Sequence, residues 1–163
     1  MEEHKNLNGF AISNKLFEWI KTNLPEGKTI LEFGSGYGTI ELTKRWKVYS
    51  IEQNEEWIGK APKSTYIHAP LREYPHIANK WFDIEKIMPH LPIKYDLMLI
   101  DAPTGIGRLG ILAFWDFFQW DVPIIVDDTN RHEELLLANF IGDKLKKEAI
   151  SIFDNDKASQ IIA

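Results

Sequence analysis

Residues 30–39 read Ile-Leu-Glu-Phe-Gly-Ser-Gly-Tyr-Gly-Thr, an apolar strand that carries an acid at Glu32 and leads into three glycines at alternate positions. Glycines at a strand end let the backbone turn sharply and approach a ligand closely. Thr39 can then open a helix whose free amide groups face that ligand. The stretch therefore predicts a strand, a nucleotide-cofactor loop and a helix in succession.

The rest of the chain alternates short apolar segments with segments of helical periodicity. This rhythm predicts strands at 29–33, 48–52, 65–69, 95–100 and 123–126, and helices at 13–23, 39–45, 79–88, 109–120 and 132–147. The run 95–100 is almost continuously apolar, which is typical of a central parallel strand covered on both faces. The final segments, 148–153 and 159–163, flank Asp154-Asn155-Asp156-Lys157, whose composition favours a hairpin turn.

This order of elements predicts an α/β fold. We expect a Rossmann-like, doubly wound, mostly parallel sheet of seven strands that ends in a C-terminal antiparallel hairpin. A chain of 163 residues with 44% hydrophobic content suits one domain spanning residues 1–163. Sheets of this kind bind ligands at the carboxyl ends of their strands, so the functional residues are expected there.

Composition limits the classes of partner. The chain has no cysteine, which excludes disulfides and thiolate chemistry and fits a reducing, cytoplasmic setting. Its net charge is -5, and its lysines and arginines are scattered among acidic residues, so no continuous basic surface for nucleic acid is expected. No apolar run approaches the ~20 residues of a membrane helix, and the polar start does not resemble a secretory signal. The oligomeric state stays open.

A second acid accompanies the glycine loop. Glu52 ends the second predicted strand twenty positions after Glu32, where doubly wound nucleotide folds place the acid that binds ribose hydroxyls. An ordinary tight turn and a solvated strand-end charge are the alternative explanations of these two features. The loop has Thr39 where the NAD motif G-x-G-x-x-G requires its third glycine, and it lacks the G-K-[ST] ending of a P-loop.

An acid followed by G-x-G-x-G resembles the first motif of class I S-adenosylmethionine-dependent methyltransferases. The resemblance extends over nearly the whole chain and implies S-adenosylmethionine as the cofactor. It implies a cofactor site made of the glycine loop with its acid, the end of the second strand and the end of the third: Glu32, Gly34, Ser35, Gly36, Gly38, Glu52, Gln53, His68 and Ala69. Within this site, methionine contacts are expected near Glu32 and Gly34, ribose contacts at Glu52, and adenine contacts near His68 and Ala69.

Three further acids follow the fourth and fifth strands. Asp101 opens the segment Asp101-Ala102-Pro103-Thr104-Gly105, and Asp127-Asp128 ends the next strand. Asp101 could orient the methionine amine, accept a proton from a hydroxyl acceptor, or bind a divalent metal together with Asp127 and Asp128. Three carboxylates at one point repel one another unless a cation or a proton compensates.

Each of these residues also has a structural interpretation. The pair Asp127-Asp128 could cap the helix that follows, and Asp101 could be a turn residue. Arg108 and Arg131 could be surface charges; as functional residues they suit a carboxylate on the substrate, because a guanidinium pairs with a planar carboxylate in two places.

The second half of the chain resembles the glucuronoxylan 4-O-methyltransferase type of polysaccharide methyltransferases. The shared features are D-A-P-T-G at 101–105, the pair Gly107-Arg108, Asp128 with Arg131 three residues on, and Trp57 after the acidic strand end. The chain departs from that family in having one residue between Gly105 and Gly107 where a longer insertion is usual. A weaker resemblance is to catechol-type metal-dependent O-methyltransferases, with Asp127-Asp128 in place of Asp-Asn.

These resemblances imply methyl transfer to a hydroxyl of a small or glycan acceptor such as a uronic acid. The residues expected on the acceptor side are Asp101, Thr104, Arg108, Asp128 and Arg131. Two alternatives stay open. An acid after the fourth strand also suits spermidine-synthase-like aminopropyl transfer, and the small size suits a non-catalytic cofactor-binding subunit.

Overall fold

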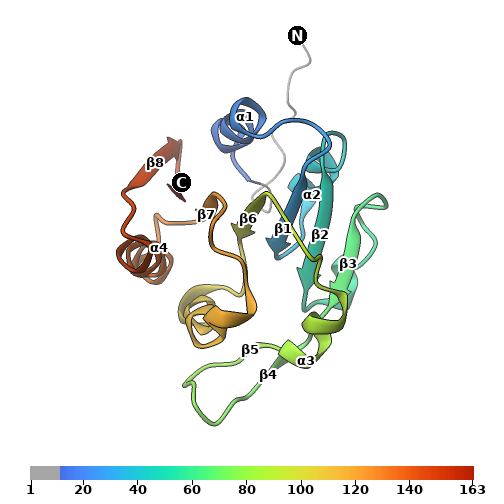
Figure 1. Cartoon of the computed structure of the whole chain (residues 1–163), viewed down its shortest axis with the longest axis vertical. Helices are drawn as coiled ribbons and strands as arrows, with labels where there is room; N and C mark the ends of the chain where they lie inside the picture. The colour runs from blue at the N-terminus through green and yellow to red at the C-terminus, as the bar shows by residue number, and fades with distance from the viewer. Residues whose placement is uncertain (1–11) are drawn as a thin grey trace.

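A computed structural model describes residues 12–163, and its main feature is a seven-stranded sheet (Figure 1). The strand order is β3-β2-β1-β6-β7-β9-β8. The first five of these are parallel, and β9 runs antiparallel to both β7 and β8. Their bounds are β1 Thr29–Phe33, β2 Lys47–Glu52, β3 Thr65–His68, β6 Leu97–Ile100, β7 Ile124–Val126, β8 Ala149–Asp154 and β9 Lys157–Ile162. The predicted mostly parallel sheet with an antiparallel end is therefore confirmed.

Helices and a small second sheet surround these strands. The α-helices are α1 Asn14–Asn23, α2 Tyr37–Leu42, α3 Ile84–Ile87 and α4 His132–Leu145. Three 3₁₀ segments are η1 Glu55–Trp57, η2 Met88–His90 and η3 Gly105–Phe117. The short strands β4 Leu71–Arg72 and β5 Trp81–Phe82 pair antiparallel apart from the main sheet. No helix within residues 12–163 is long and apolar enough to cross a membrane.

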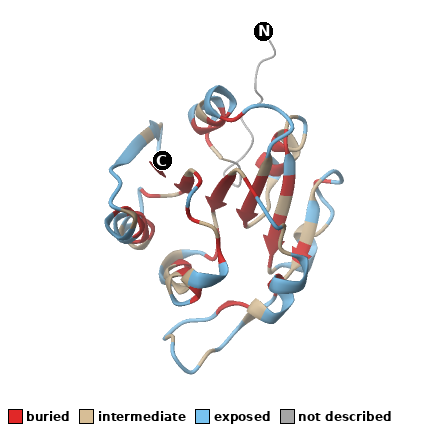
Figure 2. Ribbon diagram, viewed as in Figure 1, coloured by how far each residue is buried: buried red, intermediate tan, exposed pale blue. Residues whose placement is uncertain are grey.

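Alternate side chains of the central strands enter two separate cores, one on each face of the sheet. Leu97 and Leu99 of β6 pack in the core that contains α1, whereas Met98 and Ile100 pack in the core that contains η3 and α4. This follows from the two-residue period of a strand. Figure 2 shows the resulting concentration of buried residues in the sheet. The double burial of β6 agrees with its continuous apolar sequence.

The predicted helix at 79–88 is wrong in its first half. Trp81 and Phe82 form β5 instead, and both side chains are fully buried. The helix begins only after Asp83, whose carboxylate accepts the Glu85 N–H at 3.1 Å as an N-cap. Trp81 stacks on Phe114 and Phe82 packs against Phe33, so long-range packing overrides the apparent helical spacing.

The apolar segment at 109–120 also differs from an ordinary α-helix. Residues 105–117 form the 3₁₀ segment η3, which is interrupted by a non-helical backbone at Phe114. Gly110 lies so close to Trp81 that a Cβ atom would come within 2.6 Å of its ring. Contact with β5 therefore shapes this segment. After η3, Trp120 stacks on Trp115, with 3.7 Å between the ring centroids.

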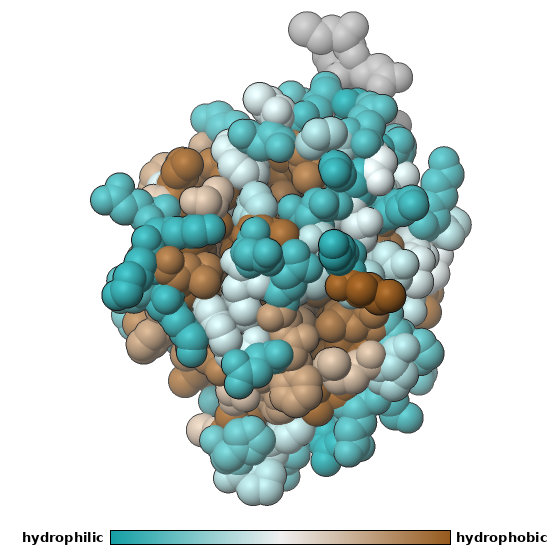
Figure 3. Space-filling model, in the orientation of Figure 1, coloured by the Kyte–Doolittle hydropathy of each residue, from teal (hydrophilic) through white to brown (hydrophobic). Residues whose placement is uncertain are grey.

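The face in Figure 3 carries hydrophilic and hydrophobic residues interspersed. The strand ends at Phe33, Glu52, Ile100 and Val126 belong to neighbouring parallel strands and so meet at one edge of the sheet. Every residue predicted to be functional lies in or beside the segments that leave this edge. The fold thus brings the two predicted groups of residues to the same place.

Candidate functional site

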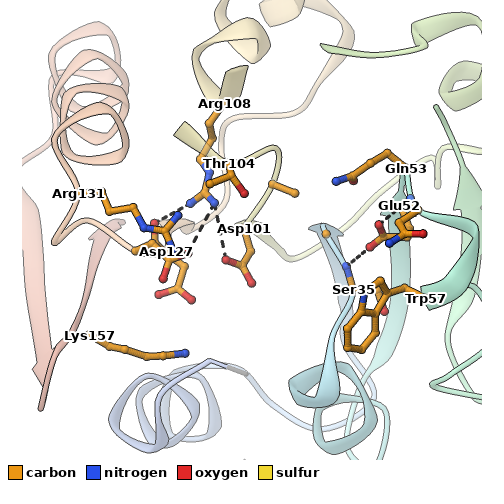
Figure 4. A pocket seen from close by; sticks show the side chains of 14 residues that line it. Ser35, Glu52, Gln53, Trp57, Asp101, Thr104, Arg108, Asp127, Arg131 and Lys157 are labelled. Atoms are coloured by element: carbon orange, nitrogen blue, oxygen red, sulfur yellow. Dashed lines mark hydrogen bonds and ion pairs between the residues drawn. The ribbon is translucent and has the colours of Figure 1, made fainter. Parts of the chain in front are cut away.

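A cavity of about 240 Å³ opens at this edge, and Figure 4 shows that its two sides carry different chemistry. One side comes from the loops after β1 and β2 and includes Gly34, Ser35, Glu52, Gln53, Asn54 and Trp57. The other side comes from the segments after β6 and β7 and from the start of β9, and includes Asp101, Ala102, Thr104, Arg108, Asp127, Asp128, Arg131 and Lys157. We call them the cofactor side and the acceptor side.

Gly34 is where the two sides touch. Its φ of +89° lies in the left-handed region, and a Cβ atom there would come within 2.7 Å of the Ala102 Cβ and 3.2 Å of the Asp101 carbonyl oxygen. Both the backbone conformation and the lack of space require glycine. The first glycine of the loop therefore allows the end of β1 to lie directly against the residue that follows β6.

Glu52 fixes the glycine loop to the end of β2. Its Oε2 accepts the Ser35 N–H at 2.6 Å, and its Oε1 accepts the Asn54 N–H at 2.9 Å. The side chain is buried yet lines the cavity. Beside it, Gln53 Oε1 is buried with no hydrogen-bond partner among the described residues. The cofactor side thus presents the Glu52 carboxylate to the cavity, and an unpaired amide oxygen of Gln53 is buried beside it.

Glu32 lies beneath the loop and is not among the residues that line the cavity. The Thr39 and Ser50 hydroxyls both donate to its Oε1 at 2.6 Å, and Thr39 Oγ1 in turn accepts the Gly36 N–H at 3.0 Å. Burial raises the pKa of Glu32 to about 7, against the lowering effect of these two hydroxyls. These contacts tie the loop to Glu32, and the expected contact of Glu32 with the cofactor stays a prediction.

The other predicted cofactor residues divide in the same way. Ser35 and Gln53 line the cavity with Gly34 and Glu52, whereas Gly36 is the N-cap of α2 and Gly38 is buried within it. His68 places its Nε2 atom 3.4 Å from the Gln53 carbonyl oxygen, and Ala69 is fully buried. The structure does not bring Gly36, Gly38, His68 and Ala69 to the wall of the described cavity.

The acceptor side is organised around Arg108, whose side chain is only 1% exposed. Its Nε and Nη1 atoms donate to the Pro103 and Asp127 carbonyl oxygens, each at 2.8 Å. Its Nη2 atom lies 3.9 Å from Asp101 Oδ1 and 3.6 Å from Asp128 Oδ2. The interpretation of Arg108 as a surface charge is therefore wrong, and its guanidinium is a buried cation that compensates Asp101 and Asp128.

Burial and mutual repulsion perturb these acids. The pKa of Asp101 is raised well above its usual range by burial and by the charge of Asp127, and Arg108 opposes this shift. The pKa of Asp127 is also raised, by burial and by Asp128, although the Ser159 hydroxyl donates to its Oδ1 at 2.7 Å. A proton is thus held more strongly here than by ordinary aspartates.

Asp127 and Asp128 do not cap the following helix. The N-cap of α4 is Arg131, which makes no side-chain cap, so the capping alternative is wrong. Asp128 instead adopts a left-handed backbone, with φ of +57°, and its Oδ2 lies 3.5 Å from Arg131 Nη2. Aspartate adopts this conformation more readily than most residues other than glycine.

The predicted metal ligands do come together. Asp101, Asp127 and Asp128 each offer an oxygen within 4.8 Å of the others. The same carboxylates, however, have partners within the chain: Asp101 and Asp128 lie beside the Arg108 guanidinium, and Asp127 accepts the Ser159 hydroxyl. Because the guanidinium already neutralises part of this charge, the donor set is better matched to an internal ion-pair network than to a bound divalent ion.

Two polar residues near the site, Lys157 and Glu134, belong to none of the motifs in the sequence. Lys157 lines the acceptor side because β9 runs antiparallel to β7, which brings its first residue to the cavity edge (Figure 4). Only the pairing of the last strands could have placed it. Glu134 is buried in the first turn of α4 and contacts both arginines, where the helical pattern alone suggests a solvated residue. Trp57 lines the cofactor side.

This chain is similar to known proteins in its fold, but not detectably in its sequence. No family model and no curated protein matches the sequence. Solved structures do match. A precorrin-8W decarboxylase from Methanobacterium thermoautotrophicum has a TM-score of 0.63 at 17% identity over 95% of this chain and 91% of its own.

Two further neighbours are described as O-methyltransferases. A putative caffeoyl-CoA O-methyltransferase from Staphylococcus aureus has a TM-score of 0.64 at 16% identity, over 95% of this chain and 86% of its own. An O-methyltransferase from Bacillus cereus, in complex with SAH, has a TM-score of 0.63 at 15% identity, over 97% and 84%. The chain therefore has the Rossmann-like fold that class I S-adenosylmethionine-dependent methyltransferases share.

Proposed function

We propose that the protein is an S-adenosylmethionine-dependent methyltransferase that acts on a hydroxyl group of a small-molecule or glycan acceptor. One observation carries the proposal: a single cavity joins the glycine loop and Glu52 to the carboxylates of Asp101 and Asp128. Cofactor and acceptor residues must share one cavity if a group is to pass between them. The methyltransferase fold of the neighbouring structures supports the same reaction class.

The residues of the cofactor side fit S-adenosylmethionine. Each oxygen of Glu52 accepts one backbone N–H and keeps a further lone pair for a ribose hydroxyl. Gln53 lines the cavity next to Glu52. Gly34 and Ser35 would lie along the methionine portion. When bound, S-adenosylmethionine supplies an electrophilic methyl group on a sulfonium centre.

The acceptor side supplies positioning and a base. A carboxylate with a raised pKa takes a proton from a hydroxyl more readily than an ordinary aspartate does, and Asp101 has this property at the cavity wall. Arg108 holds Asp101 and Asp128 from the buried side. Thr104 and Arg131 line the cavity beside them, and Arg131 is 44% exposed, which suits contact with a carboxylate on a uronic acid. No metal enters this proposal.

The charge of the acceptor side gives no specific reason to prefer aminopropyl transfer. A polyamine would need uncompensated acids, whereas Arg108, Arg131 and Lys157 line the same cavity as the three aspartates. Both earlier alternatives remain as outcomes of the experiment below.

Two measurements test the proposal. Calorimetry compares S-adenosylmethionine with its decarboxylated form, and a transfer assay uses labelled S-adenosylmethionine with catechols and uronic-acid oligosaccharides, with and without chelator. We expect binding of S-adenosylmethionine and labelling of a hydroxyl acceptor. Preference for the decarboxylated form would indicate aminopropyl transfer, and binding without transfer to any acceptor would indicate a non-catalytic subunit. Absence of binding to either form would overturn the proposal.

A further inference from the structure

Glu134 is a buried carboxylate whose surroundings require an explanation. Its side chain is 0% exposed, and its Oε2 atom is buried without a hydrogen-bond partner among residues 12–163. Burying a charge is unfavourable unless strong contacts compensate it. The first turn of a helix offers some compensation through the helix dipole, but an exposed position in that turn would receive the same benefit. The contacts of the other oxygen must therefore account for the burial.

Those contacts connect two segments that are distant in sequence. Glu134 Oε1 accepts the Gly105 N–H at 2.8 Å and lies 3.4 Å from Arg131 Nη1. It also lies 4.0 Å from Arg108 Nη2. Gly105 closes the loop that begins at Asp101, and Arg131 is the N-cap of α4. One carboxylate thus ties the loop after β6 to the start of α4.

Both arginines lie between Glu134 and the acids of the cavity wall. Arg108 Nη2 is 3.6 Å and Arg131 Nη2 is 3.5 Å from the same oxygen of Asp128. Each guanidinium is therefore shared between Glu134 behind it and Asp128 in front of it. Glu134 itself is not among the residues that line the cavity, so it acts on the site only through these neighbours.

We propose that Glu134 is a positioning residue of the acceptor side. It holds the Asp101–Gly105 loop against α4 and orients the two guanidinium groups toward Asp101 and Asp128. Its role in turnover rests on the proposed methyl transfer, whereas its role in fixing the loop rests on the observed contacts alone.

Two conservative variants separate length from charge. Glu134→Asp keeps the charge but shortens the side chain away from Gly105, and Glu134→Gln keeps the reach and the acceptor oxygen but removes the charge. Glu133→Gln is the matched control, because it removes the same charge from the neighbouring, partly exposed position. Amide hydrogen exchange read by mass spectrometry follows the 101–108 segment without any acceptor.

We expect Glu134→Asp to speed exchange in 101–108 by about tenfold or more, and Glu134→Gln and the control to leave it near that of the wild type. Both Glu134 variants should lower kcat by about tenfold or more with affinity for S-adenosylmethionine within about threefold, because the contacts of Glu134 lie on the acceptor side. The control should change neither quantity.

Unchanged exchange in the Glu134→Asp variant would overturn the proposal. A loss of S-adenosylmethionine affinity equal to the loss of turnover would also overturn it, since a general structural role would affect both sides. If the wild-type protein transfers no methyl group at all, the proposed function fails, whereas the exchange and affinity measurements still decide the role of Glu134.

Discussion

At Gly34, both the fold and the candidate site require the absence of a Cβ atom. The left-handed φ of +89° and the 2.7 Å approach to Ala102 both exclude a Cβ. We predict that Gly34→Ala lowers the free energy of unfolding by about 2–4 kcal/mol, from backbone strain together with the clash. It should also weaken binding of S-adenosylmethionine, because the loop must move away from Asp101.

Gly27 offers a matched control for this variant. It has a similar φ of +80° but nothing within 4 Å of the position of a Cβ. Gly27→Ala therefore reports the strain alone, and urea unfolding of the two variants isolates the contribution of the clash. Equal destabilisation in both variants would show that the clash of the new Cβ atom with Ala102 does not contribute to the loss of stability.

Asp101 is the residue that we expect to separate chemistry from binding. Asp101→Asn keeps the size of the side chain but removes the base, so turnover should fall at least about 100-fold. Affinity for S-adenosylmethionine should change by less than about threefold, because Asp101 lies on the acceptor side (Figure 4). Steady-state kinetics and calorimetry on the same preparation test this. An equal loss in both would assign Asp101 to the cofactor.

Glu32 connects three elements, because it belongs to β1 and accepts hydrogen bonds from Thr39 of α2 and Ser50 of β2. Its pKa in the folded protein, about 7, lies above the ordinary value of 4.5. Between these two values the folded state binds more protons than the unfolded state, so stability due to this group falls as pH rises from about 4.5 to about 7. The full effect is on the order of 3 kcal/mol.

Glu32→Gln should remove this dependence while it retains an oxygen that accepts both hydroxyls. The quantity to follow is the difference in free energy of unfolding between variant and wild type, measured with urea from pH 4.5 to 8, since other acids titrate in both proteins. We expect the variant to gain relative stability as pH rises. A difference that does not change with pH would refute the assigned pKa.

Arg108 belongs to η3 and binds the segments after β6 and β7 to each other. Arg108→Met leaves three clustered carboxylates without their buried cation and should destabilise the protein by about 3–5 kcal/mol at pH 8. The loss should be smaller at pH 5, because protonation relieves the repulsion among acids whose pKa values are already raised. Urea unfolding at the two pH values measures it.

A chelator tests the same network. If the guanidinium is the compensating cation, EDTA should leave the melting temperature of the wild-type protein within about 1 °C, whereas magnesium should raise that of Arg108→Met. A large drop for the wild type in EDTA would restore the metal interpretation of Asp101, Asp127 and Asp128.

At the scale of the whole molecule, the strands of the main sheet could be predicted from the sequence, whereas the segments that pack against the sheet could not all be predicted. Continuous apolar runs such as 97–100 predict buried parallel strands directly, and the turn chemistry at 154–157 predicts the hairpin. The helix expected at 79–88 failed because Trp81 stacks on Phe114 of η3 and Phe82 packs against Phe33 of β1, contacts that no local pattern contains. Long-range packing decided that segment.

The candidate site follows the same division. Glycine spacing and strand-end acids were enough to place Gly34, Glu52 and Asp101 around one cavity. The burial of Arg108 and Glu134 could not be predicted, because each depends on charges that come from three different segments. Sequence spacing finds the residues at strand ends, whereas the ion-pair network behind them appears only when the strands are side by side.

The most direct test of the central claim, that one cavity joins a cofactor side to an acceptor side, is a crystal structure of the protein with S-adenosylhomocysteine. We predict that the ribose contacts Glu52, that the ligand follows the loop at Gly34 and Ser35, and that its sulfur faces Asp101 and Asp128. A ligand bound outside this cavity, or one whose sulfur faces away from the two aspartates, would contradict the account.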